Sequence, residues 1–211
     1  MQFYVLAKPR AQDSDVRTDF LSAGRRKFGE APKCPLCGAT IGLLPALPPR
    51  RVELELWGRH FSDLAFGAGT DVLVSARFRD AFLRSGLTGF SGFAPVEIAK
   101  VAARLRKIPK PLPRYFQAVP GRSRAVIDDR ASGLDYEERW TCEECRIGSI
   151  ERMRRLVLEP GTWSGEDVFI ARGLPGRIIT SEKFKKFCDK EAFTNCVLIE
   201  AAHYHFDFFP D

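Results

Sequence analysis

Histidine is scarce in this chain, which limits the catalytic chemistry available to it. Only 3 of the 211 residues are histidine, and no G-x-x-x-x-G-K loop is present to cradle a phosphate. Gly89–Gly92 lacks the glycine spacing of a nucleophile elbow and predicts a turn. His203, His205 and Asp207 would share one face of a strand, and they would need a further ligand such as His60 to bind a metal. We therefore expect a protein that is not an enzyme.

Long hydrophobic runs are also absent. No stretch approaches the ~18 consecutive apolar residues of a membrane-spanning helix. The first twenty residues show no basic start, no long apolar run and no small-residue cleavage site. The sequence therefore predicts no membrane span and no secretion signal, with the reducing cytoplasm as the compartment.

Six cysteines are too few for a disulfide-dense secreted scaffold of this size. Four of them form two Cys-x-x-Cys knuckles, at Cys34, Cys37, Cys142 and Cys145. A structural zinc ion takes four ligands in tetrahedral geometry, so each knuckle supplies half a site. Disulfides, a redox pair and no metal at all are the alternatives to one shared Zn²⁺. Four thiolates leave no open coordination position, so this zinc would be structural.

The residues around the knuckles refine this interpretation. Pro35 and Gly38 are typical of a tight turn that curls around a metal, whereas the second knuckle has Arg146 where the first has Gly38. Cys188 and Cys196 lie outside both knuckles, and we expect them to be small buried hydrophobic residues.

Acidic residues are missing between Ile98 and Ile127, although the whole chain has 33 basic and 27 acidic residues and a net charge of only +6. Such a run of positive charge can bind the phosphates of a nucleic acid, with Tyr115 and Phe116 available to stack on bases. It can equally steer an acidic protein partner. We call its eight basic residues the basic segment: Lys100, Arg104, Arg106, Lys107, Lys110, Arg114, Arg122 and Arg124.

Residue patterns predict an α+β chain of strands and short helices. Alternation of apolar and polar residues is clearest in the expected strand Val52–Trp57. Val16, Phe20 and Leu21 would line one side of a short helix within Asp13–Lys27. Further strands are expected at Phe3–Leu6 and Tyr115–Val119, an extended proline-rich connector at Ile108–Arg114, and a central strand at Val197–Phe209 with Tyr204, Phe206 and Phe208 on one face.

Two further helices have a recognisable start signal. Ser75 and Ser181 are suited to be N-caps, because a serine hydroxyl accepts a hydrogen bond from the first-turn amides. Apolar residues three and four apart would then pack into the core. These are Phe78, Phe82 and Leu83 in the first helix, and Phe184, Phe187 and Cys188 in the second.

The two halves of the chain resemble each other. Trp57 and Trp163, Ser75 and Ser181, and Phe78 and Phe184 are each 106 positions apart, as are Arg77 and Lys183, and the knuckle cysteines are 108 apart. We interpret this as an internal duplication, with an N-terminal half at 1–107 and a C-terminal half at 108–211. Each half carries one knuckle, and the two would form one compact unit joined by a zinc-ribbon-like site.

The two knuckles and the residues between them resemble a known family. Trp57-Gly58, Val74-Ser75-Ala76-Arg77-Phe78 and Ser85-Gly86-Leu87-Thr88-Gly89-Phe90 are similar to the double-CXXCG motif proteins of myxobacteria, over nearly the whole chain. The resemblance implies an immunity protein. Such a protein would act in the cytoplasm and occlude a Sit-type lipoprotein toxin that kin cells exchange. We expect the basic segment, Lys100 to Arg124, to engage an acidic surface of that toxin. The alternative is a zinc-ribbon protein that binds nucleic acid.

Overall fold

The computed structural model describes residues 1–9, 16–24, 27–42, 44–104 and 107–208. The chain is mostly β, with three short α-helices, which agrees with the predicted α+β class. The helices are α1 (Ala76–Ser85), α2 (Asp129–Ser132) and α3 (Glu182–Glu191), with a 3₁₀ turn η1 (Ala201–His203). The strands are β1 (Phe3–Ala7), β2 (Thr18–Ser22), β3 (Arg50–Leu56), β4 (Leu64–Phe66), β5 (Val72–Ser75), β6 (Phe90–Ala103), β7 (Tyr115–Val126), β8 (Leu134–Glu138), β9 (Ser149–Met153), β10 (Val168–Arg172), β11 (Ile178–Ser181), β12 (Val197–Glu200) and β13 (Phe206–Asp207).

Ten of the strands form one sheet in the order β12-β1-β11-β10-β7-β5-β4-β2-β3-β6. β6 closes part of this sheet on itself, because Val96–Ala103 pair with β3 and Phe90–Pro95 pair with β7. The strands β2 to β7 thus form a closed ring. Its interior contains buried residues such as Phe20, Leu54 and Tyr115.

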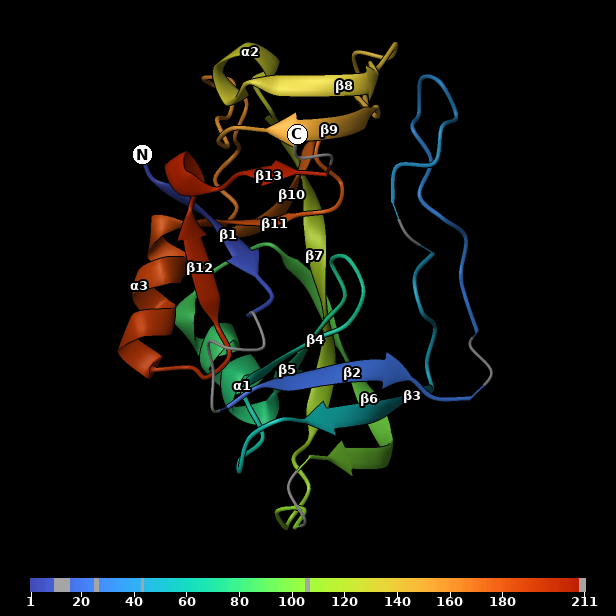
Figure 1. Ribbon diagram of the computed structural model, residues 1–211, viewed down its shortest axis with the longest axis vertical. Helices are drawn as coiled ribbons and strands as arrows, with labels where there is room; N and C mark the ends of the chain where they lie inside the picture. Colours follow the sequence, from blue (N-terminus) through green and yellow to red (C-terminus); the bar gives the residue numbers. More distant parts are fainter. Residues whose placement is uncertain (10–15, 25–26, 43, 105–106, 209–211) are drawn as a thin grey trace.

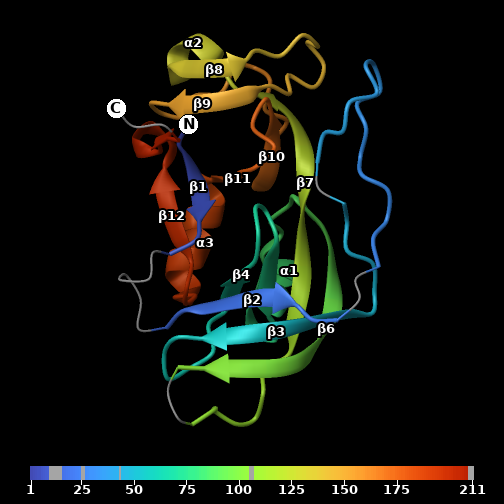
Figure 2. The same cartoon turned by 45° about the vertical axis from the view of Figure 1, so that its right-hand side comes forward.

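β7 connects the ring to the rest of the molecule. It runs along the long axis of the molecule (Figures 1 and 2), and its far end pairs with β10, where Ile170 lies opposite Arg122. β1 enters that second part of the sheet between β11 and β12, with Val5 opposite both Ile179 and Ile199. A separate three-stranded sheet, in the order β13-β9-β8, lies at the end of the molecule (Figure 1).

A second core joins the helices to the sheet and is rich in phenylalanine. Phe78 of α1 and Phe184 of α3 are both fully buried, and their ring centroids are 6.2 Å apart. Cys188 is buried in the same cluster, as predicted, whereas Cys196 is only partly buried and packs against it. Leu83 is a correction to the predicted apolar stripe, because it is 64% exposed on the outer side of α1.

Ser75 caps α1 as predicted, and a buried aspartate completes the cap. The Ser75 Oγ accepts from the Phe78 N–H at 3.1 Å and donates to Asp63 Oδ1 at 2.8 Å. Asp63 also accepts from the N–H of Thr194 at 3.0 Å, in the turn that follows α3. The start of one helix is therefore tied to the end of the other.

Ser181 caps α3 through the same set of contacts. It donates to Asp167 Oδ1 at 2.6 Å, and the Asp167 Oδ2 accepts from the N–H of Thr88, in the turn that follows α1, at 3.0 Å. Gly89 next to this turn has φ +114, and a Cβ there would lie 1.9 Å from the carbonyl oxygen of Val168. Only glycine fits so close an approach.

Two local predictions were wrong. Phe20 and Leu21 lie in strand β2 instead of a helix within Asp13–Lys27, because β2 pairs with β3 on one side and β4 on the other. Residues 13–15 and 25–26 of that expected helix lie outside the described residues. Residues 90–92 of the expected Gly89–Gly92 turn belong to β6.

The predicted central strand Val197–Phe209 is also corrected. β12 ends at Glu200 and is the edge strand of the large sheet; η1 then turns the chain, and β13 pairs with β9 in the other sheet. Phe209 lies outside the described part. The sequence predicts a single strand because Tyr204, Phe206 and Phe208 continue the alternation of apolar residues beyond the turn.

Candidate metal centre

The four knuckle cysteines meet at one point, although the two knuckles are far apart in the sequence. Their Sγ atoms all lie within 4.8 Å of one another. Cys34 and Cys142 are 3.8 Å apart, and Cys37 and Cys145 are 3.7 Å apart. In a tetrahedral site with Zn–S bonds of about 2.3 Å, the sulfur atoms would be separated by about 3.8 Å. The cluster therefore has the size and donor set of a Cys₄ metal site.

A tight turn positions the first pair. The N–H of Gly38 donates to the carbonyl of Cys34 at 3.0 Å, and the N–H of Cys34 donates to the carbonyl of Ala39 at 2.8 Å. Gly38 closes the turn in the left-handed region, with φ +73. Glycine adopts this conformation without steric cost.

The second pair lies on an equivalent turn with an arginine in the glycine position. The N–H of Arg146 donates to the carbonyl of Cys142 at 2.8 Å, and Arg146 has φ +49. This conformation costs a non-glycine residue roughly 1–2 kcal/mol. The departure from the CXXCG pattern therefore preserves the backbone geometry of the knuckle.

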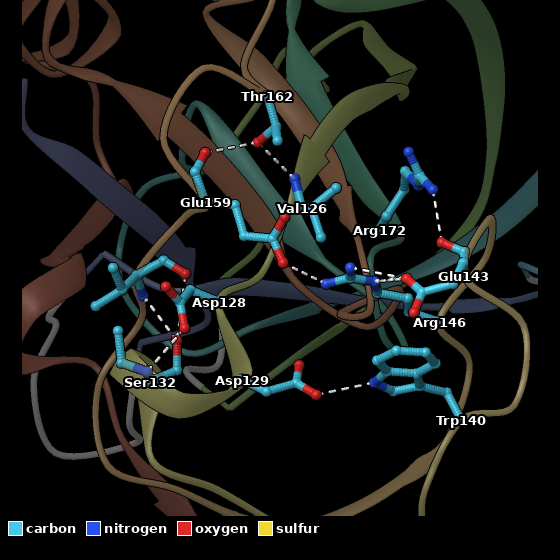
Figure 3. Close-up of polar contacts among 12 residues, drawn as sticks. Val126, Asp128, Asp129, Ser132, Trp140, Glu143, Arg146, Glu159, Thr162 and Arg172 are labelled. Atoms are coloured by element: carbon cyan, nitrogen blue, oxygen red, sulfur yellow. Dashed lines mark hydrogen bonds and ion pairs between the residues drawn. The ribbon is translucent and has the colours of Figure 1, made fainter.

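The side chain of Arg146 holds the turn in place (Figure 3). It donates to the Glu143 carboxylate at 2.9 Å, forms an ion pair with Glu159, and lies over the ring of Trp140 at 4.8 Å from the ring centroid. Trp140 in turn donates to Asp129 of α2 at 2.9 Å. The network around Arg146 thus links the second knuckle to α2 and to the chain after β9.

Arg172 at the end of β10 fixes the knuckle from the other side. It donates to the carbonyl of Glu143 at 2.7 Å and to the carboxylate of Glu144 at 3.2 Å. The N–H of Gly173 donates to the carbonyl of Cys145 at 3.3 Å. Sequence reasoning missed Arg172, because nothing local to it indicates a contact with a loop nearly thirty residues earlier.

The ionisation of the four thiols depends on how close they are. The N–H of Cys145 lowers the pKa of Cys142 to about 7, against the opposing effect of burial. The N–H of Ala39 lowers the pKa of Cys37, but burial and the sulfur atoms of the other three cysteines outweigh it and raise this pKa to about 12. Neighbouring thiolates repel one another, and a divalent cation relieves that repulsion. The residues present fit a bound metal ion.

The cluster joins two parts of the molecule. Cys34 and Cys37 lie at the tip of a long irregular hairpin that we call the arm, residues 27–47, of which residue 43 lies outside the described part. The arm runs beside the body, and its tip reaches the loop between β8 and β9 (Figures 1 and 2). With four protein ligands, a metal ion here would have no open position for a substrate.

The structure divides the basic segment among three places. Lys100 and Arg104 lie at the end of β6, where Lys100 is opposite Glu53 and Arg104 stacks over Trp57, 3.8 Å from the ring centroid. Lys107, Lys110 and Arg114 lie in the connector between β6 and β7, and Arg106 lies outside the described residues. Arg122 and Arg124 lie on the far half of β7, where Arg122 donates to the carbonyl of Ile41 in the arm.

The predicted face of His203, His205 and Asp207 does not form. His203 belongs to η1 and lies 3.6 Å from Glu200, while Asp207 of β13 pairs with Arg152 at 3.4 Å. His60 is exposed. Within the part of the chain that the structure describes, the four cysteines are the group of potential ligands close enough to share a metal ion.

Comparison with known proteins identifies one family. A family model described as "Immunity protein family (Imm11)" matches residues 23–203, which includes both knuckles and all three helices. A search of curated proteins finds no match. Across the described residues, no helix is both long enough and apolar enough to cross a membrane.

Proposed function

The chain belongs to the Imm11 immunity protein family, and on this basis we propose that it protects the cell that makes it by binding a cognate toxin. The family match over 23–203 is the observation that carries the proposal. Proteins of an immunity family are typically not catalytic. Neutralisation would therefore be steric: the bound chain would block the active surface of the toxin. The toxin would then be inhibited as fast as the complex forms.

We further propose that the toxin is a Sit-type lipoprotein toxin passed between kin cells and that the chain acts in the cytoplasm. The two knuckles support this narrower assignment, because they are the motif for which the chain resembles the myxobacterial double-CXXCG proteins. Arg146 departs from the motif, yet it adopts the left-handed backbone that the motif's glycine would supply.

We propose a structural Zn²⁺ as the ion held by Cys34, Cys37, Cys142 and Cys145. The sulfur separations of 3.7 and 3.8 Å support it, and four thiolate donors favour zinc over hard cations such as Mg²⁺. The ion would supply cross-linking of the arm to the body, and no chemistry on a substrate.

We also propose that the chain arose by duplication of a half with the bounds 1–107 and 108–211. The reciprocal helix contacts support it, because Asp63, Ser75 and Thr88 in the first half correspond in role to Asp167, Ser181 and Thr194 in the second. In addition β1 lies between β11 and β12, just as β7 lies between β5 and β6. On this proposal, the two halves have exchanged their first strands.

A binding and protection experiment tests the proposed function. The purified chain would be titrated calorimetrically with the purified product of the toxin gene adjacent to its own gene. A stoichiometric complex is expected, and co-expression of the chain should abolish killing by that toxin. If the toxin does not bind and cells are not protected, the proposed function is wrong. If the chain instead retains nucleic acid with an affinity that falls steeply with salt, the nucleic-acid alternative takes its place.

A further inference from the structure

The arm presents apolar side chains to solvent. Leu36 is 76% exposed, Leu44 is 51% exposed and Leu47 is 43% exposed. With Phe28 at 44%, the arm contributes four of the nine exposed large hydrophobic residues in the described part of the chain, although it is a small part of it. Exposed apolar side chains that gather on one segment are a mark of an interaction site.

The two knuckles differ in what their central residues contact. In the second knuckle the central residues are Glu143, which pairs with Arg146 of the same knuckle, and Glu144, which pairs with Arg172 of β10. In the first knuckle the central residues are Pro35 and Leu36, and both are exposed. The two turns have the same backbone form, so metal binding does not explain why a leucine is displayed at one and not the other.

Basic residues outnumber acidic ones on the arm and on the adjoining part of β7. The arm contains Lys27 and Lys33 against a single acidic residue, Glu30. Arg122 and Arg124 follow on β7 beside the arm, and Arg122 contacts its backbone. Within the described residues Lys27, Lys33 and Arg124 have no ion-pair partner. A partner surface that complements this region is apolar at its centre and acidic at its rim.

The arm is already ordered in the free protein. Backbone hydrogen bonds join its two sides, including Leu47 N–H to Lys27 O at 2.9 Å and Ile41 N–H to Pro32 O at 2.9 Å. Arg122 and the cysteine cluster hold it against the body. A partner that binds it does not have to overcome the entropy of ordering a loose loop.

We propose that the arm is the toxin-binding surface, with Leu36 and Leu44 at its centre and Lys33 and Arg124 at its rim. The occupant is the cognate toxin, through an apolar patch bordered by carboxylates. This inference rests on the proposed function and narrows the binding surface to the arm. We therefore expect that the basic residues near β3 and in the connector are not required for toxin binding.

The test uses the full chain and the purified product of the adjacent toxin gene. Leu36→Glu and Leu44→Glu are each expected to weaken toxin binding by roughly tenfold or more, because they place a charge at the centre of the interface. Lys33→Glu and Arg124→Glu are expected to slow association and to reduce its dependence on salt. Leu83→Glu is the matched control, because Leu83 is equally exposed on α1, and it should bind as the wild type does.

The outcomes separate this inference from the proposed function. If the wild type binds the toxin and the arm variants, with unchanged metal content and melting temperature, bind equally well, the arm is not the interface and the proposed function stands. If the wild type does not bind the toxin, the proposed function fails and the inference with it. If Leu36→Glu converts a dimer of the chain to a monomer and leaves toxin affinity unchanged, the occupant is a second copy and the proposal is overturned.

Discussion

At the scale of single residues, Arg146 combines an unfavourable backbone conformation with a side chain that compensates for it. Its φ of +49 is disfavoured for any residue with a Cβ, while its guanidinium contacts Glu143, Glu159 and Trp140. The knuckle thus depends on Arg146 for contacts with Glu159 and Trp140, which lie outside the Cys-x-x-Cys motif. The spacing of the cysteines predicted the cluster, but not these contacts, because they come from residues whose positions only the fold determines.

Comparison of Arg146→Ala with Arg146→Gly measures the free-energy cost of the left-handed backbone conformation at this position. Both variants lose the ion pairs, but only alanine retains the backbone strain. Arg146→Ala is expected to be less stable than Arg146→Gly by about 1 kcal/mol in urea unfolding of the metal-bound protein. Gly38→Ala provides the reference, because it introduces the same strain at φ +73 in open space. Equal stability of the two Arg146 variants would show that the left-handed conformation carries no cost here.

Asp63 makes stability depend on pH. Burial raises its pKa, but hydrogen bonds from Arg77, Thr194 and Ser75 outweigh burial and hold the pKa below its ordinary value of 3.8. A carboxylate with a lowered pKa stabilises the fold above about pH 4, and this contribution is lost as the pH falls through the folded-state pKa. Asp63→Asn is therefore expected to cost about 1–3 kcal/mol at pH 7 and progressively less below pH 4.

Urea unfolding between pH 7 and pH 3 checks this expectation. The wild type and Asp63→Asn should converge in stability at the acid end. Asp80→Asn is the control, because Asp80 pairs with Arg79 while its side chain remains 42% exposed, and so solvent-accessible a pair contributes little. A constant difference between the wild type and Asp63→Asn at every pH would contradict the assigned role of the carboxylate.

At the scale of elements, the sequence predicted correctly the features that depend on neighbouring residues, namely strand faces and helix caps. The alternation of β3 and the serine caps of α1 and α3 are confirmed, since a strand face and an N-cap depend on residues within a few positions. The sequence predicts a helix around β2 because the few apolar residues there, Val16, Phe20 and Leu21, would share one side of a helix. Its true conformation is set by pairing with β3 and β4, which come later in the chain. The prediction for the chain after β12 is wrong for the same reason. Contacts with β1 and β9, which lie far away in the sequence, position η1 and β13.

The proposed exchange of first strands between the two halves predicts that neither half folds alone. β1 fills the position between β11 and β12, with Val5 only 1% exposed. A fragment of residues 108–211 is therefore expected to remain unfolded, because its sheet lacks a central strand and leaves two edges unpaired. Addition of a peptide of residues 1–9 should restore dispersed amide signals in NMR spectra, whereas the same peptide with Val5→Asp should not. Cooperative unfolding of the fragment by itself would refute this expectation.

At the scale of the whole molecule, the position of the arm depends on the cysteine cluster. The ring of strands, the helix layer and the junction of the two sheets each have their own buried core, and none of these three clusters of described residues includes a knuckle cysteine. Among the described residues of the arm, only Cys34 is buried. Its position depends on backbone hydrogen bonds within itself, on Arg122 and on the four cysteines. Loss of the metal should therefore release the arm and leave the body folded.

Hydrogen exchange before and after chelation tests this coupling. The amides of Gly29, Ile41 and Leu47 are bonded within the arm and should exchange faster when zinc is removed, whereas the amides of β1 should not change. Cys142→Ser should have the same effect without chelator, and Cys196→Ser, outside the cluster, should have none. Since a ligand at about 100 times its Kd stabilises the state that binds it by about 2.7 kcal/mol, arm exchange should accelerate by roughly a hundredfold. Unchanged arm protection in the metal-free protein would show that the cluster does not hold the arm. Global unfolding on chelation would show instead that the cores depend on the metal.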